Sequence, residues 1–143
     1  MICQNRTRKK CSVSKMKFLA LLVYQEIMDI HKFIKSFGYA IQGIVTAMSE
    51  QNFRFHVLSA VTVVIVGLLT GLSITEWIII VFVIALVIGA ELFNTAIERV
   101  VDLASPDYHP LAKQAKDIAA ASVFVFAACS VIIGLLVFLP KWV

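Results

Sequence analysis

Oxygen-bearing side chains recur along one segment of the sequence at spacings of three, four and four residues. They belong to two glutamates, an asparagine and an aspartate: Glu91, Asn94, Glu98 and Asp102. On a helix, at about 100° per residue, positions 91, 98 and 102 fall within about 40° of one another, and position 94 is offset by about 60° from position 91. These four residues, here called the acidic stripe, are therefore predicted to share one side of a helix.

The chemistry that suits the acidic stripe is cation binding. Clustered carboxylates repel one another unless a cation lies among them, and hard oxygen ligands suit Mg²⁺, which takes one or two carboxylates and fills its shell with water and phosphate oxygens. Glu91 also lies within an apolar run, where an ionisable group costs about 2.5–3.5 kcal/mol and marks a functional site by default. The alternative is that the acids only pair with Arg99, Lys113 or Lys116 and join helices together. We favour the metal site.

Lysines follow the acidic stripe in the sequence. Lys113, Lys116 and Asp117 are three and four residues apart and can share a helix face. Alone, such lysines would be interpreted as snorkelling residues that mark a helix end. A lysine beside Mg²⁺-bound phosphates is, however, a recurring arrangement in phosphoryl transfer, and we favour that interpretation here. Neither a GxxxxGK[ST] loop nor a kinase GxGxxG loop is present, so a nucleotide would bind without them.

A second polar group precedes the first long apolar run. Glu50 and Arg54 are four residues apart, the spacing of a helix-surface ion pair worth only about 0.2–0.5 kcal/mol. From this spacing alone the two residues are predicted to be structural. His56 by itself is predicted to be an interfacial histidine rather than a ligand.

Three apolar segments are each long enough to cross a hydrocarbon core of about 30 Å. The composition is 60% hydrophobic and 15% charged, whereas soluble domains have roughly 45–50% apolar and about 25% charged residues. A soluble protein this short could not bury so much apolar surface. We predict an all-α integral membrane protein with transmembrane helices over residues 57–74, 77–103 and 113–139. The connection from Ser105 to Pro110 contains two prolines and is predicted to be a turn.

A helix over residues 30–55 is predicted to precede these spans. Its apolar residues recur at intervals of three and four, as in an amphipathic helix on a membrane surface. A helix packed only on its own protein fits the pattern equally well. Residues 1–29 are a basic extension whose short apolar run lacks the small-residue cleavage site of a signal peptide. No nucleic-acid module accompanies this positive charge, so the anionic leaflet of a membrane is the better partner.

The basic residues also predict an orientation. Nine of the thirteen Lys and Arg residues precede residue 55, and the connection over residues 71–76 has none. By the positive-inside rule, the N-terminus and the connection over residues 99–116 face the cytoplasm, and the C-terminus lies outside.

The segment Glu91–Asp102 resembles the defining motif of the prokaryotic diacylglycerol kinase family, Glu-x-apolar-Asn-Ser/Thr-Ala-Ile-Glu-x-x-Val-Asp, at every fixed position. Flanking sequences agree as well: Ser-Pro-Asp-Tyr-His from Ser105, Ala-Lys-Asp from Ala115, and Glu50 with Asn-Phe-Arg from Asn52. The resemblance extends from about Phe33 to Leu139. It implies a homotrimeric membrane enzyme, with sites shared between chains, that moves the γ-phosphate of MgATP to a lipid alcohol.

The resemblance also implies a role for each matching residue. Glu91 would be the general base that takes the proton of the lipid hydroxyl, and Glu50 and Glu98 would hold Mg²⁺. Arg54 and His56 would help to position the lipid. The implied nucleotide-binding residues are Glu50, Glu98, Asn94, Asp102, Lys116 and Asp117.

His56 bears on the choice of lipid. Members from Gram-negative bacteria that act on diacylglycerol carry an acidic residue at this position, whereas Asn-Phe-Arg-x-His resembles the Gram-positive branch, which phosphorylates undecaprenol. We therefore expect undecaprenol as the substrate, in a bacterial cell membrane with the active site facing the cytoplasm. Diacylglycerol is the alternative lipid. The alternative of another class is a non-enzymatic membrane subunit whose acids bind cations.

Overall fold

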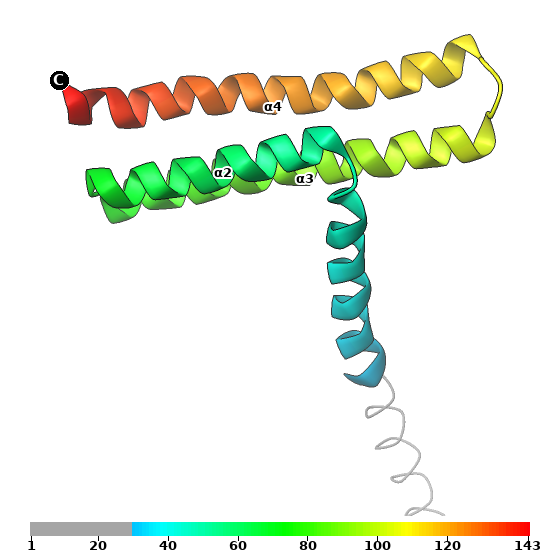
Figure 1. Cartoon of the computed structure of the whole chain (residues 1–143), viewed down its shortest axis with the longest axis horizontal. Coiled ribbons are helices and arrows are strands. Elements are labelled where there is room, and N and C mark those ends of the chain that lie inside the picture. The colour runs from blue at the N-terminus through cyan, green and yellow to red at the C-terminus, as the bar shows by residue number, and fades with distance from the viewer. Residues whose placement is uncertain (1–29) are drawn as a thin grey trace, which may run out of the picture. The chain divides into compact units, whose positions relative to one another are not determined.

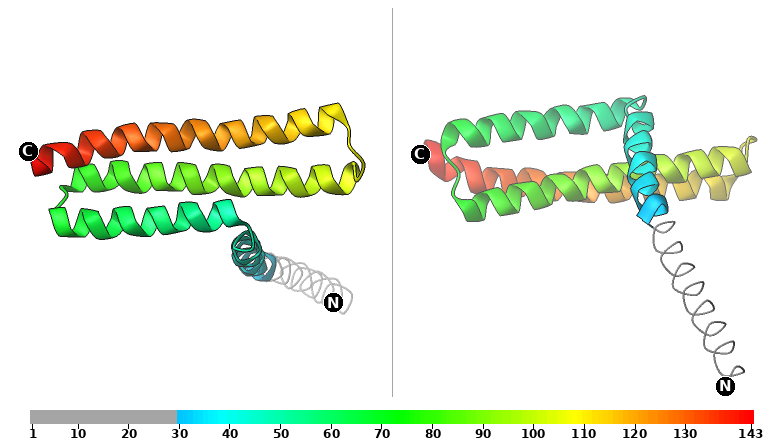
Figure 2. Two further views of the ribbon diagram at one scale, coloured as in Figure 1. Left: turned by 45° about the horizontal axis from the view of Figure 1, so that its top comes forward. Right: turned by 90° about the horizontal axis from the view of Figure 1, so that it is seen from below.

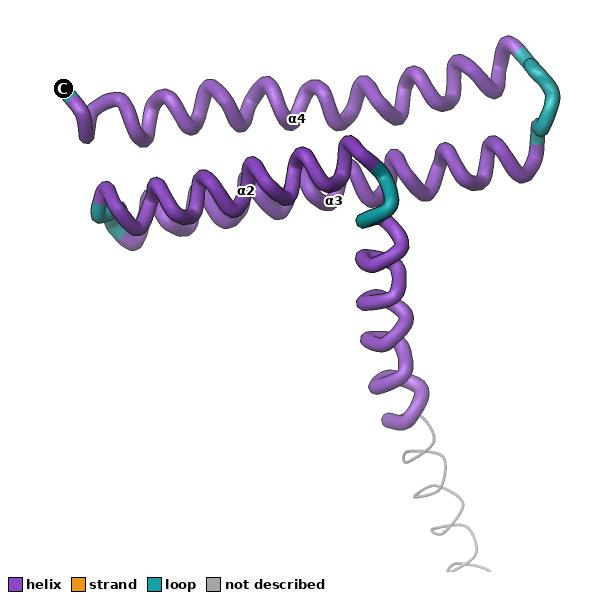
Figure 3. Tube along the Cα trace, in the orientation of Figure 1, coloured by secondary structure: helices purple, strands orange, loops and turns teal. Residues whose placement is uncertain are grey.

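The computed structural model describes residues 30–143, so the predicted extension over residues 1–29 lies outside the described part. The described residues divide between residues 43 and 44 into two units. All regular secondary structure within residues 30–143 is helical, as Figure 3 shows by colour. The all-helical fold predicted from the sequence is thereby confirmed for this part of the chain.

The first described helix covers residues 30–47. Its large apolar side chains are exposed, and the rings of Phe33 and Phe37 meet edge to face with centroids 5.0 Å apart. The predicted continuation of this helix to residue 55 is wrong. Residues 48–50 form a turn in which the Ser49 hydroxyl donates to the Thr46 carbonyl, and Glu50 has the extended backbone of a residue that begins a new helix.

Three long helices follow: α2 over Gln51–Thr70, α3 over Ile74–Ala104 and α4 over Pro110–Trp142. Each is long and apolar enough to cross a membrane. At 1.5 Å per residue, α2 is about 30 Å long and α3 about 46 Å. A hydrocarbon core of about 30 Å therefore matches the whole of α2 but leaves several turns of α3 beyond it. α4 has 33 residues and is similarly long.

The connection between α2 and α3 is a tight turn fixed by local chemistry. Gly71 ends α2 in the left-handed region (φ 66°), which only glycine adopts without strain. Ser73 then begins α3 with a capping box, in which its hydroxyl accepts from the backbone N–H of Glu76 and the Glu76 carboxylate accepts from the backbone N–H of Ser73. Ile74, predicted to end the first span, is therefore the first residue of α3.

α3 packs against both α2 and α4, and Figures 1 and 2 show the three helices running side by side. A core cluster of Leu72, Ile80 and Val137 lies towards the end of the bundle that contains the α2–α3 turn. At the same end, Lys141 Nζ lies 2.9 Å from Glu76 Oε2 and joins the end of α4 to the start of α3.

The opposite end of α3 leads into α4 through a short turn. Ser105 ends α3, and its hydroxyl donates to the carbonyl of Asp107. His109 caps α4, since its Nδ1 accepts from the backbone N–H of Leu111. Pro110 is the first residue of α4 rather than the last of the turn, a position where proline lacks no needed donor.

Candidate active site

The acidic stripe lies along the second half of α3 and changes steadily in exposure. Glu91 is 2% exposed and Asn94 is 4% exposed. One turn further on Glu98 is half-buried, and Asp102 is exposed. The predicted stripe is therefore graded from a buried carboxylate to one that faces solvent.

The buried end of the stripe lines a pocket of about 230 Å³, here called the carboxylate pocket. α3 contributes Glu91 and Asn94, and α2 contributes Asn52 and His56. The wall from α4 is apolar and includes Ala127. The Glu91 carboxyl lies within electrostatic range of His56, Glu98 and Glu50.

Asn94 is a polar residue of this pocket whose side chain is only partly hydrogen-bonded within the protein. Its Nδ2 donates to Glu98 Oε1 at 3.2 Å, which fixes the orientation of the amide. Its Oδ1 is buried and has no hydrogen-bond partner. A buried oxygen without a partner costs free energy unless a donor or a cation reaches it. The Oδ1 atom of Asn94 is therefore available to accept a hydrogen bond from a ligand or to bind a cation.

The residues available to a metal ion are oxygen donors, which fit Mg²⁺. Within residues 30–143, no group of three or more His, Cys, Asp or Glu side chains lies together as a ready metal site. Mg²⁺ commonly uses only one or two carboxylates and takes its other ligands from phosphate and water. Glu98 and the free Oδ1 of Asn94 can supply such oxygens without a larger protein cluster.

Glu50 has a different partner from the one expected. Its Oε1 lies 3.1 Å from Nη2 of Arg99, and the same arginine nitrogen donates to Ser49 Oγ at 3.3 Å. Between Glu50 and Arg54 the structure has only the backbone hydrogen bond of the helix start, so the predicted side-chain pair is wrong. The ion pair with Arg99 of α3 therefore holds the Glu50 side chain next to the helix that contains the acidic stripe.

Lys113 and Lys116 point to different partners. Lys116 Nζ reaches Asp102 Oδ1 at 2.7 Å and joins α4 to α3, whereas Lys113 Nζ pairs with Asp117 Oδ2 at 2.6 Å on its own helix. All four residues line a polar pocket of about 400 Å³ beside the α3–α4 turn. The alternative in which the acids of the stripe pair with basic residues therefore holds for Asp102, while Glu50 and Asp117, which lie outside the stripe, have basic partners as well. Among the ion pairs of the described residues, none includes Glu91 or Glu98.

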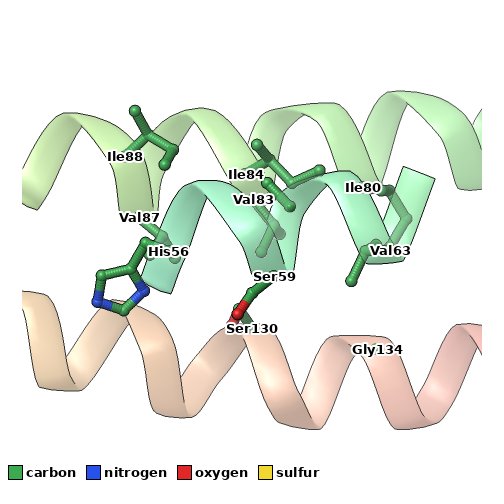
Figure 4. Close-up of a pocket in the computed structure, with 11 residues that line it drawn as sticks. His56, Ser59, Val63, Ile80, Val83, Ile84, Val87, Ile88, Ser130 and Gly134 are labelled. Carbon is green, nitrogen blue, oxygen red and sulfur yellow. The ribbon is translucent and has the colours of Figure 1, made fainter. Parts of the chain in front are cut away.

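Apolar cavities adjoin the carboxylate pocket at His56 and Ala127. Two cavities of about 100 and 530 Å³ lie between α2 and α4, with α3 along one side of the smaller cavity. Both are lined by His56, Ser59, Val63, Ser130 and Gly134, and we call them together the apolar groove. Figure 4 shows Ser59 and Ser130 facing the same space from α2 and α4. His56 lines the groove and the carboxylate pocket, and so does Ala127.

Two residues that line the site, Asn52 and Ser59, were not identified as site residues from the sequence. They lie four residues before and three residues after His56 on α2, and the small residues of α4 in the groove follow a similar interval. This helical spacing of polar and small residues is a signal that could have found them. Arg99 was considered only as a structural partner, because its contact with Glu50 joins residues far apart in sequence.

The arrangement has the parts needed to move a phosphoryl group at a membrane surface. A buried carboxylate is available to accept a proton, an amide oxygen and carboxylates can hold a cation, and a lysine stands near the solvent. An apolar groove adjoins the buried end. These features together define a membrane protein with a phosphotransfer site.

Comparison with known proteins agrees with this class. Residues 38–138 match the prokaryotic diacylglycerol kinase family. The chain is 54% identical over 114 residues to the undecaprenol kinase of Bacillus subtilis (strain 168), covering 79% of this chain and 93% of that protein. It is 36% identical over 97 residues to a diacylglycerol kinase of Pseudomonas aeruginosa, covering 67% of this chain and 79% of the relative.

A third relative is a diacylglycerol kinase of Synechocystis, 41% identical over 107 residues. These residues are 73% of this chain but only 61% of that protein, less than two thirds of its length. The chain belongs to the prokaryotic diacylglycerol kinase family. It is a lipid kinase, which excludes the non-enzymatic subunit considered as an alternative.

Proposed function

We propose that the protein transfers the γ-phosphate of ATP to undecaprenol and forms undecaprenyl phosphate. The observation that carries this proposal is the position of Glu91, a carboxylate that is 2% exposed and lines a pocket adjoining a long apolar groove. The lipid is chosen from the 54% identical relative and from His56, which lines both the pocket and the groove.

In the proposed reaction, Glu91 takes the proton of the lipid hydroxyl. The hydroxyl oxygen forms a bond to the γ-phosphorus, and the bond from that phosphorus to the bridging oxygen of ADP breaks. Asn94 and Lys116 position phosphate oxygens, and Asp102 and Asp117 support the nucleotide site. The polar pocket beside the α3–α4 turn, which contains Lys116, supports a nucleotide on the solvent side of Glu91.

Glu50 and Glu98 are the proposed carboxylate ligands of Mg²⁺, with Asn94 Oδ1 as a further oxygen donor. Bound there, the cation would neutralise charge on the phosphates. The hydrogen bond from Asn94 to Glu98 supports a shared role for these two residues. Glu50 Oε1 is paired with Arg99, so to bind Mg²⁺ the Glu50 carboxylate would have to weaken or give up this ion pair.

His56 and Arg54 are proposed to position the lipid at the start of α2. His56 lines the meeting point of the carboxylate pocket and the groove, so it is suited to orient the alcohol. The isoprenoid chain would follow the groove away from Glu91. Arg54 is exposed and has the charge to hold the phosphate of the product near the membrane surface.

The proposed assembly is a homotrimer in a bacterial cell membrane, with sites shared between chains and facing the cytoplasm. Large apolar side chains on the side of α3 away from the acidic stripe support contacts with lipid or with other copies: Phe93 is 74% exposed and Val100 is 65% exposed. The proposed surface helix is the described helix over residues 30–47, whose large apolar side chains are exposed. The excess of basic residues before residue 55 supports a cytoplasmic N-terminus.

A lipid phosphorylation assay on the purified full chain tests the proposal. The protein is given Mg²⁺, ATP and either undecaprenol or diacylglycerol at matched concentrations in mixed micelles. We expect faster transfer to undecaprenol, and we expect none to either lipid when Mg²⁺ is chelated. Faster transfer to diacylglycerol would replace the proposed lipid, and activity that persists without divalent cations would remove Mg²⁺ from the mechanism.

A further inference from the structure

We propose that the apolar groove selects its lipid by shape, with Ala127, Ser130 and Gly134 of α4 forming a recessed wall that accepts one branched polyisoprenoid chain and rejects a pair of acyl chains. This inference rests on the proposed function and deepens it. It assigns the preference between the two lipid classes to named residues of the groove, away from the reacting atoms.

The first support is the continuity of the groove with the carboxylate pocket. Ala127 and His56 line both, so a chain attached to an alcohol near Glu91 can continue directly into the groove. The groove extends along α4 as far as Trp142, whose ring lies 6.4 Å from that of Phe138. From residue 127 to residue 142 the helix rises about 22 Å, so the groove follows a long stretch of a single chain.

The second support is an independent sign of a ligand at the pocket end. Asn94 is 4% exposed, lines the carboxylate pocket, and has a buried Oδ1 without a hydrogen-bond partner. A hydrogen-bond donor or a cation of a ligand would satisfy this oxygen. The occupant of the combined space is therefore a molecule with a polar head at Glu91 and Asn94 and an apolar remainder in the groove.

The third support is the spacing of small residues along α4. Residues 127, 130 and 134 are separated by about 4.5 and 6 Å along the helix axis. Every unit of a polyisoprenoid carries a methyl branch, so its width varies along its length on a similar scale. Opposite them on α2 lie Ser59 and Ala60, which are also small. A wall that is recessed at intervals accommodates methyl branches that a smooth wall would push away.

The fourth support is the hydrogen bonding of the two serines. Ser59 Oγ donates to the Phe55 carbonyl at 2.9 Å, and Ser130 Oγ donates to the Ala127 carbonyl at 2.7 Å. Their donors are thus used within their own helices. An isoprenoid chain needs no donors, whereas the ester carbonyls of a diacylglycerol lose hydrogen bonds to water when they enter such a space. The smaller cavity of the groove is enclosed by all three helices and has a volume of only about 100 Å³, which suits one narrow chain better than two.

Gly134 gives a direct test, because a Cβ atom there would meet no other atom within 4 Å. Gly134→Leu therefore introduces a larger side chain at a groove position where its Cβ atom has open space. Ala128→Leu is the matched control, since Ala128 is an exposed residue of the same helix outside the groove lining. Both variants and the original chain are assayed with undecaprenol, with diacylglycerol and with geraniol, a prenol of only two isoprene units.

We expect Gly134→Leu to lower kcat/KM for undecaprenol by about tenfold through a higher KM, while activity on geraniol stays within about twofold. Ala128→Leu should leave all three substrates unchanged. Retained activity on geraniol shows that the variant is folded. An equal loss on undecaprenol and geraniol, or no loss on either, would overturn the groove inference. If the original chain phosphorylates neither prenol, the proposed function fails instead, so the two failures are distinct.

Discussion

Arg99 Nη2 lies 3.1 Å from Glu50 Oε1, so a residue of α3 holds the side chain of the residue that precedes α2. The side chains are 50% and 41% exposed, and an exposed pair of this kind contributes at most about 1 kcal/mol to stability. Glu50 is also a proposed ligand of Mg²⁺. The guanidinium and the cation therefore compete for one carboxylate.

This competition predicts opposite effects of two substitutions. Arg99→Gln should lower the Mg²⁺ concentration needed for half-maximal activity by up to about fivefold, because the carboxylate is released and a nearby positive charge is removed. Glu50→Gln should raise that concentration. Magnesium titrations of initial rates measure both. If Arg99→Gln also needs more Mg²⁺, the arginine assists the metal site and the competition does not exist.

Glu91→Gln should keep the fold and ATP binding but reduce turnover by at least about 100-fold, because an amide cannot accept the hydroxyl proton. The side chains have nearly the same shape, and Glu91 forms no ion pair among the described residues that its loss would break. Initial rates and equilibrium ATP binding separate the two effects. Glu76→Gln, on the same helix but paired with Lys141, is the control and should remain active. Turnover in Glu91→Gln near the original value would remove this residue from the role of base.

Lys116 and Lys113 form a matched pair for testing the nucleotide site. Lys116→Met should raise the KM for ATP by about tenfold or more, because a charge-assisted hydrogen bond to phosphate is worth about 1.5–3 kcal/mol. Lys113→Met should change this KM little, because its ammonium group pairs with Asp117 on its own helix. Steady-state kinetics with varied ATP measure both variants. Equal effects would show that general positive charge, rather than Lys116 itself, attracts the nucleotide.

Gly67 is expected to be a packing requirement of the bundle. A Cβ atom there would lie 3.0 Å from Cη2 of the Trp77 ring and 2.9 Å from Leu72 Cδ1. The indole is rigid, so Gly67→Ala should cost about 1–3 kcal/mol through overpacking. Gly134→Ala, in open space, should instead gain up to about 1 kcal/mol from helix propensity. Thermal unfolding in detergent micelles should move in opposite directions for the two variants, and stabilisation by Gly67→Ala would contradict the packing at Trp77.

The parts of the fold that depend on periodicity were predictable from the sequence. The acidic stripe follows from the angle per residue, and the three membrane helices follow from the length of the apolar runs. The break over residues 48–50 was missed because Glu50 fits a continuing helical pattern and only its extended backbone shows the new start. Ile74 was misplaced because an apolar residue can end one helix or begin the next; the capping box at Ser73 decides it.

Side-chain partners across helices were predictable only in part. Lys116 was considered as a possible partner of the acids in the stripe, and it is paired with Asp102 at 2.7 Å. Glu50 was considered together with Arg54 because periodicity reveals only contacts within one helix, between residues three or four apart. Its actual partner is Arg99, 49 residues away in sequence, which depends on how α2 packs against α3. The apolar groove likewise arises from packing, and the spacing of small residues on α4 indicates only one of its walls.

The length of α3 allows one helix to serve both inside the membrane and beyond it. At about 46 Å this helix is roughly half as long again as the hydrocarbon core of a bilayer. Its buried carboxylate at Glu91 and its exposed carboxylate at Asp102 are held in register by one continuous set of backbone hydrogen bonds. Tasks that other enzymes divide between a membrane anchor and a separate soluble domain can then be carried out by successive segments of one continuous helix.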